Sequence, residues 1–149
     1  TREPGTSPPI RHRDFVAIEA ANRSLGLGGE LLVLRFERDR LRSAGLDRLA
    51  DDVEHVSLEQ GDGAGFDIRS FSLDGKDRFI EVKTTVSGAT TPIFVTANEA
   101  RFSERTGERF ALARVFAFRS KPRMFELAGP LSLHFDLIAT NYVGRMRAK

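Results

Sequence analysis

The segment GFDIRSFSLDGKDRFIEVKTT, residues 65–85, decides the fold that the sequence predicts. Apolar and polar residues alternate with a period of two in Phe66–Leu73 and again in Phe79–Thr85, which is the pattern of half-buried β-strands. Asp74-Gly75 lies between the two stretches, and Asp-Gly is a strong signal for a tight turn between strands. The segment therefore predicts a β-hairpin.

Helices are predicted before and after this hairpin, because apolar residues recur there at every third or fourth position. They are expected over Asp14–Arg23, Glu30–Ser43 and 97–106. The glycine-rich stretch 26–29 separates the first two, since glycine weakens a helix interior. The third should begin after Thr96-Ala97-Asn98-Glu99, which has the Thr-x-x-Glu form of a capping box.

Further strands are expected in four stretches, at 53–58, 92–95, 110–118 and 124–127. Helices and strands then follow one another in a mixed order along the chain. This order predicts an α/β (α+β) domain in which a mixed central β-sheet is flanked by helices.

Length and composition restrict the class of protein. The chain has 149 residues, of which 40% are hydrophobic and 30% charged, so it suits one soluble domain with a single core. It contains no cysteine, which excludes disulfides and thiolate metal sites. No stretch approaches the roughly 20 apolar residues that a membrane span requires. We therefore expect a cytoplasmic protein that does not bind a membrane.

The start of the chain differs in composition from the rest. Residues 1–13 contain Pro4, Pro8 and Pro9 and are predicted to be a linker. Residues 14–149 are predicted to form the folded domain. Because the chain does not begin with Met, we expect it to be a domain of a longer protein.

Three residues are the candidates for a catalytic or metal-binding role: Asp67, Glu81 and Lys83. The strand period places Glu81 and Lys83 on one face, and Asp67 lies between two apolar residues on the preceding strand. Two converging carboxylates suit a hard cation such as Mg²⁺, and a nearby lysine could orient the water that attacks a phosphodiester. The alternative is an ordinary surface ion pair between Glu81 and Lys83.

The length of the hairpin turn determines whether Asp67 and Glu81 lie on the same face of the sheet. A strict two-residue turn at Asp74-Gly75 would pair Ile68 with Glu81 and turn Asp67 to the other face of the sheet. A common site therefore requires an odd-length connection or a β-bulge, which Asp-Gly turns often supply. We predict such an irregularity.

The basic residues are mostly arginine, 19 of 23. Arginine presents a planar fork that suits phosphate, although a coding bias toward arginine would produce the same count. Arg35, Arg38 and Arg42 fall on one side of a predicted helix, and Arg69 lies in the hairpin. These four are the candidate nucleic-acid contacts, with solvated surface charges as the alternative.

The histidines are too far apart in sequence to indicate a zinc site. His55 lies in a predicted strand. We interpret it as a structural residue, with a DNA-facing role as the alternative.

Several blocks together resemble a known domain. They are Gly29-Glu30-Leu31, residues 61–71, Ile80–Thr85, Asn98-Glu99 and Arg114-Val115-Phe116. Between about Ser24 and Gly129 the chain is similar to the uncharacterised domain named after the C-terminal region of the plant NO VEIN protein. More broadly it resembles the PD-(D/E)XK nuclease superfamily, which has a restriction-endonuclease-like fold.

This resemblance implies an activity and a set of site residues. Asp67 and Glu81 would bind Mg²⁺, for which Mn²⁺ can substitute, with the carbonyl of Val82 as a further ligand. Lys83 would assist the attacking water and Glu30 would complete the site. The expected activity is hydrolysis of DNA phosphodiesters, as the nuclease module of a larger defence, restriction or DNA-processing protein. The expected partners are DNA, helicase, ATPase or restriction-type domains of the parent protein, and a second copy in a homodimer.

Three alternatives accompany these expectations. Glu30 in the first turn of a helix would also be stabilised by the helix dipole without a catalytic role. Asn98 and Glu99 are interpreted as capping residues, with a substrate contact as the alternative. The whole domain could also bind DNA or a partner protein without cutting.

Overall fold

The computed structural model of the protein describes residues 12–149. Most of the predicted linker, 1–13, thus lies outside the described residues. Its last two residues, His12 and Arg13, differ from the expectation because they already belong to helix α1 (His12–Ser43).

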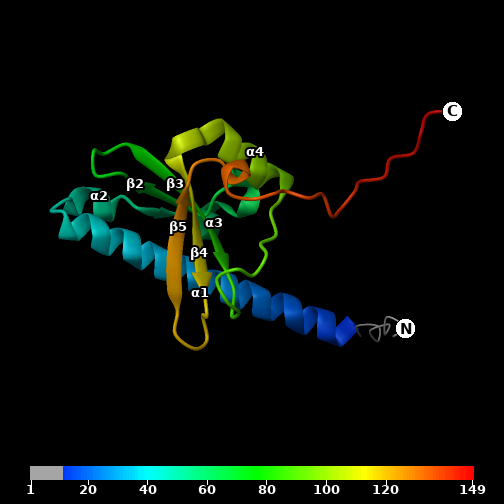
Figure 1. The fold of residues 1–149 in the computed structure, drawn as a ribbon, viewed down its shortest axis with the longest axis horizontal. Coiled ribbons are helices and arrows are strands. Elements are labelled where there is room, and N and C mark those ends of the chain that lie inside the picture. The colour runs from blue at the N-terminus through cyan, green and yellow to red at the C-terminus, as the bar shows by residue number, and fades with distance from the viewer. Residues whose placement is uncertain (1–11) are drawn as a thin grey trace.

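The core of the fold is a five-stranded mixed sheet in the order β1-β2-β3-β4-β5 (Figure 1). The strands are β1 (Glu54–His55), β2 (Ile68–Phe71), β3 (Asp77–Thr84), β4 (Phe110–Phe116) and β5 (Arg123–Ala128). Only β3 and β4 pair in parallel. Parallel neighbours need a long crossover connection, and this one contains helix α4 (Ala97–Thr106). The predicted α/β class with a mixed central sheet flanked by helices is confirmed.

The two faces of the sheet carry separate apolar clusters. Ile80 and Val82 of β3 pack with Val33 of α1 in one cluster. Phe110 and Leu112 of β4 form the other, against which Phe102 of α4 packs. Helix α1 therefore covers one face and α4 the other, as Figure 1 shows. Two short helices, α2 (Asp47–Asp51) and α3 (Val56–Gln60), complete the domain.

The expectation of two N-terminal helices was wrong, because α1 is a single helix of 32 residues. Its glycines have a packing role. A Cβ on Gly29 would stand 1.8 Å from Thr84 Oγ1, and a Cβ on Gly28 would stand 2.6 Å from the Phe118 ring. A glycine in a helix interior costs roughly 0.5–1 kcal/mol relative to alanine. Here it lets α1 approach β3 closely without ending the helix.

Two predicted strands were also wrong. In 53–58 only Glu54 and His55 pair in the sheet, and α3 begins at Val56. The stretch 92–95 has no regular secondary structure. The first stretch alternates in polarity and the second is a short apolar run, but neither pattern is enough to form a full strand.

The hairpin between β2 and β3 has the irregularity that the sequence predicted. Its register pairs Ile68 with Ile80 and Phe71 with Asp77, so the connection has an odd number of residues. The backbone N–H of Gly75, whose φ is +87°, donates to the Ser72 carbonyl at 2.9 Å. A glycine in this left-handed conformation closes the type of turn that shifts the register by one residue.

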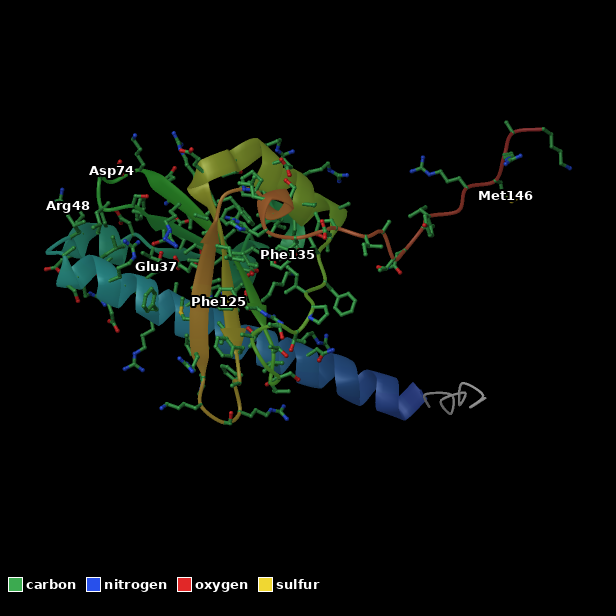
Figure 2. The ribbon with its side chains drawn as sticks, viewed as in Figure 1. Glu37, Arg48, Asp74, Phe125, Phe135 and Met146 are labelled. Carbon is green, nitrogen blue, oxygen red and sulfur yellow. The ribbon has the colours of Figure 1, made fainter. Side chains whose placement is uncertain are left out.

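Helix α4 begins where the capping motif predicted. The Thr96 side chain accepts from the Glu99 backbone N–H, and the Glu99 side chain accepts from the Thr96 backbone N–H. After the short 3₁₀ turn Leu131–Leu133, the chain runs out as an irregular segment in which Met146 is exposed (Figure 2). In the part of the chain that the structure describes, we find no helix with the length and apolar character of a membrane span.

Candidate functional site

The predicted site residues meet beside the C-terminal half of the central strand β3, where the chain enters β2. The β2–β3 pairing ends at Ile68 and Ile80, and the Asp67 N–H donates to the Ile80 carbonyl at 2.9 Å. Asp67 and Glu81 line the same cavity and interact electrostatically. Together with Glu30 and Lys83 they line an open cavity of about 500 Å³. The structure therefore brings together the four side chains that the sequence placed in the site.

Asp67 is fixed by the backbone of β3. Its Oδ2 accepts a hydrogen bond from the Val82 N–H at 2.8 Å. The N–H and C=O of one strand residue point to the same side, so the Val82 carbonyl faces the same edge as Asp67. Val82 itself is not among the residues that line the cavity, so its carbonyl as a ligand stays a prediction.

Glu30 reaches the site from the interior of α1. It accepts a hydrogen bond from Ser57 Oγ and lies 3.3 Å from His55 Nε2, and its charge acts on Asp67 by repulsion. Because α1 begins at His12, Glu30 is far from the helix N-terminus. The helix-dipole explanation for this residue was wrong, since the dipole acts only within the first turn.

Lys83 is held between two carboxylates. Its Nζ lies 3.0 Å from Glu81 Oε1 and 3.0 Å from Glu99 Oε2. Glu99 is also the capping residue of α4, so the interpretation as a cap is confirmed, but it is incomplete. The capping box holds the start of α4 against the site through Lys83.

The acids of the site lie in an environment that disfavours their charge. Burial raises the pKa of Asp67 to about 7, and repulsion from Glu30 acts in the same direction, whereas the Val82 hydrogen bond opposes it. Burial and the nearby Asp67 charge raise the pKa of Glu81 well above its usual range. Burial lowers the pKa of Lys83, but attraction from Glu81 and Glu99 outweighs it and leaves that pKa raised. Asp67 and Glu81 thus keep their protons to a higher pH than ordinary carboxyl groups, in a site with four acidic side chains and one lysine.

The donor set fits a hard divalent cation in part. Asp67 and Glu81 supply carboxylate oxygens and Val82 a carbonyl, which are donors that Mg²⁺ prefers. Over residues 12–149 no group of three or more histidine, aspartate or glutamate side chains is placed to hold a metal ion. Mg²⁺ commonly keeps several waters and binds through one or two carboxylates, so these residues could hold it in that way.

The four predicted nucleic-acid contacts lie away from this cavity. Arg38 donates to the Val53 carbonyl at 3.1 Å, and Arg42 pairs with Asp51 at 3.3 Å. Arg69 pairs with Glu54 at 2.7 Å. Arg35 is exposed. Three of the four therefore make contacts within the protein, and their role toward DNA stays a prediction.

Sequence reasoning missed part of the cavity wall. Arg23 and Gly26 line it from α1, His55 from β1 and Ser57 from α3. Arg23 and Glu30 are seven residues apart, which places them on one helix face. This signal was hidden because the glycines were interpreted as a break between two helices. The position of His55 beside Glu30 depends on a contact between distant segments.

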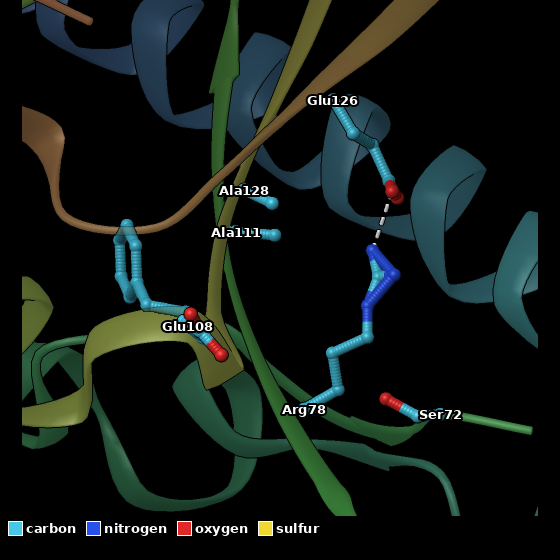
Figure 3. A pocket seen from close by; sticks show the side chains of 7 residues that line it. Ser72, Arg78, Glu108, Ala111, Glu126 and Ala128 are labelled. Carbon is cyan, nitrogen blue, oxygen red and sulfur yellow. Dashed lines mark hydrogen bonds and ion pairs between the residues drawn. The ribbon is translucent and has the colours of Figure 1, made fainter. Parts of the chain in front are cut away.

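A second cavity, of about 220 Å³, contains the other polar cluster of the domain (Figure 3). Arg78 of β3 and Glu126 of β5 form an ion pair in it at 2.5 Å. Arg78 alternates with Phe79 along β3, so it projects from the face that α1 covers, whereas Glu81 and Lys83 project from the other. The two polar clusters are therefore separate.

Comparison with known proteins identifies the domain family. No curated protein and no solved structure matches the chain. The family model described as "Protein NO VEIN, C-terminal" matches residues 29–127. This span contains β1 to β4 and nearly all of β5, with Glu30, Asp67, Glu81, Lys83 and Glu99. The chain therefore belongs to the family of the NO VEIN C-terminal domain.

Proposed function

We propose that this domain is a Mg²⁺-dependent endonuclease of the PD-(D/E)XK type that hydrolyses phosphodiester bonds of DNA. The observation that carries the proposal is that Asp67, Glu81 and Lys83 line one cavity, with Lys83 Nζ 3.0 Å from Glu81. The raised pKa values of Asp67 and Glu81 support it, because a bound cation would offset the charge that burial disfavours.

Each residue has a distinct part in this proposal. Asp67, Glu81 and the Val82 carbonyl hold the metal, and Mn²⁺ can replace Mg²⁺. When bound, the metal lowers the pKa of water and stabilises the charge that develops on the phosphate. Lys83 donates a hydrogen bond to the attacking water or to a phosphate oxygen. Glu30 orients Asp67 and, through its contacts with His55 and Ser57, attaches α1 to the site.

In hydrolysis, the water oxygen forms a bond to phosphorus while the bond from phosphorus to the leaving sugar oxygen breaks. The water proton must pass to an acceptor, and the leaving oxygen must gain a proton. The carboxylates lining the cavity are the candidate acceptors. The exposed opening of the cavity lets solvent donate the second proton.

Family membership supports a role as one module of a larger protein. We propose helicase, ATPase or restriction-type domains as its neighbours in the parent chain, and a homodimer for cutting both strands of a duplex. The cleavage assay tests the nuclease activity on which both proposals rest.

A second candidate function is a domain that binds DNA or a partner protein without cutting. The observation that favours it is the double pairing of Lys83, whose Nζ contacts both Glu81 and Glu99. These contacts engage two of the three N–H donors of the Lys83 ammonium, which leaves one for water or phosphate.

The test is a cleavage assay on supercoiled, linear and single-stranded DNA with Mg²⁺ or Mn²⁺, with EDTA as the metal-free control. Asp67→Ala, Glu81→Ala and Lys83→Ala should each reduce cleavage by about 100-fold or more. Lys76→Ala is the matched control, because Lys76 is an exposed lysine in the hairpin turn, and it should cut like the unmodified domain. Cleavage that survives EDTA or the Lys83 substitution would contradict the assignment, and intact DNA in all metals would favour the second candidate.

A further inference from the structure

One glycine of α1 is not explained by packing. Gly28 and Gly29 lie against Phe118 and Thr84, where a Cβ would clash. At Gly26, by contrast, no described atom lies within 4 Å of the place where a Cβ would stand. A glycine in a helix interior destabilises the helix relative to alanine. The fold itself therefore gives no reason for a glycine at this position.

Gly26 does lie on the wall of the site cavity. Arg23 is three residues before it and Glu30 four residues after it, so the three share one face of α1. Along this face Arg23 is basic, Gly26 leaves the helix backbone uncovered, and Glu30 belongs to the acidic cluster. The cavity thus has one positively charged end, one negatively charged end and an open helix surface between them.

Leu27 and Leu58 add apolar surface to the same cavity. They are 39% and 65% exposed. Apolar side chains next to a basic rim suit a ligand with alternating anionic and apolar parts, such as a nucleic-acid strand with its phosphates and sugars. A free metal ion or a small anion would not use them.

We propose that the sugar-phosphate backbone of the DNA strand crosses α1 at Gly26, and that Arg23 binds a phosphate next to the one that is cut. This inference rests on the proposed function for the position of the cut. The absent side chain at Gly26 allows the strand to approach the helix backbone. The Arg23 guanidinium can bind the phosphate through two parallel hydrogen bonds. Arg23 rather than Arg35, Arg38 or Arg42 has this role, because among these four only Arg23 lines the cavity.

The test measures DNA binding and protein stability on the same variants. Binding of fluorescent single-stranded and duplex oligonucleotides is measured in Ca²⁺, at several salt concentrations. Gly26→Ala and Gly26→Leu change the bare helix surface, and Arg23→Ala removes the charge. Arg35→Ala is the matched control, since it removes an exposed arginine of the same helix outside the cavity.

The expected results separate function from folding. Gly26→Ala should raise the thermal midpoint, because alanine is the better helix former, and yet weaken DNA binding; Gly26→Leu should weaken it further. Arg23→Ala should weaken binding about threefold to tenfold and reduce the slope of log affinity against log salt by roughly 0.7–0.9, which is the loss of one phosphate contact. Arg35→Ala should change both quantities less. The better-bound oligonucleotide identifies the strand form.

The outcomes distinguish this inference from the proposed function. If the domain cuts DNA but the Gly26 and Arg23 variants bind like the unmodified domain, the inference is overturned and the nuclease assignment stands. If the domain does not cut but these variants lose binding, the inference is supported and the nuclease assignment fails. Destabilisation by Gly26→Ala, or no binding of either oligonucleotide by the unmodified domain, would overturn the inference.

Discussion

Helix α1 and strand β3 each contribute to two polar clusters, and the two differ in how their charges are balanced. In the first, Glu37 is fully buried and pairs with Arg40 at 2.7 Å and with Arg78 at 3.7 Å. Arg78 also pairs with Glu126 (Figure 3). Two acids and two arginines therefore compensate one another within the protein.

The second cluster, at the candidate site, has an excess of acid. Asp67, Glu81, Glu30 and Glu99 gather around a single lysine, Lys83. This difference in charge balance indicates that the first cluster, around Glu37, has a purely structural role. Internal compensation fixes α1 on the sheet, whereas the acidic cavity beside the central strand β3 is where we propose that a cation from solution binds.

The largest expected effect is on the compensated cluster. Glu37→Ala would leave Arg40 and Arg78 without their buried partner, and should lower the free energy of unfolding by about 3–5 kcal/mol in urea denaturation. The control is Asp51→Ala, which breaks an exposed pair with Arg42 and should cost about 0–1 kcal/mol. Equal losses in the two variants would contradict the structural role of the Glu37 cluster.

The uncompensated cluster should respond to pH in the opposite way to ordinary carboxylates. The pKa of Asp67 rises from 3.8 to about 7 on folding, so between these values the folded state holds a proton that the unfolded state has lost. Stability should therefore fall as the pH rises from about 4 to about 7, and the raised pKa of Glu81 acts in the same direction.

Asp67→Asn tests this pH dependence. At pH 8 it should raise the free energy of unfolding, on the order of 1–3 kcal/mol, and flatten the pH profile. Excess Mg²⁺ should reduce this gain, because a bound cation offsets the same charge. Glu59→Gln changes an exposed acid and serves as the control. A destabilised Asp67→Asn with an unchanged profile would show that the cluster is balanced after all.

The smallest expected effect separates the two roles of Glu99. Thr96→Ala removes one side of the capping box and should cost about 1 kcal/mol of stability. Glu99→Gln keeps a side-chain oxygen for the cap but loses the charge that faces Lys83, and should change stability by less than about 0.5 kcal/mol. If the glutamine variant is the less stable one, the Lys83 contact rather than the cap holds α4 in place.

Local signals were sufficient for several elements of the fold. The alternation in 66–73 and 79–85, the Asp-Gly turn and the Thr96 capping box each depend on residues close together in sequence, so the hairpin and the start of α4 were predicted correctly. The odd-length turn could also be predicted, because only that register places Asp67 and Glu81 on one face.

Contacts between distant segments decided what the sequence left open. Gly28 and Gly29 weaken a helix when considered alone, but close packing against Phe118 and Thr84 keeps α1 continuous. The alternating stretch 53–58 forms a strand only at Glu54 and His55 and turns into helix α3 at Val56, because tertiary packing overrides weak strand propensity.

By itself, the sequence determined the class of the sheet, the hairpin and the identities of Asp67, Glu81 and Lys83, because these follow from period and turn chemistry. The tertiary structure alone decided that Glu30 meets Asp67, that Glu99 holds Lys83, and that Arg23 and Gly26 form the cavity wall. The physical reason is that the contacting residues lie far apart in the sequence. A side-chain contact between α1, β3 and α4 depends on how the helices pack against the sheet, and no local pattern in the sequence records that packing.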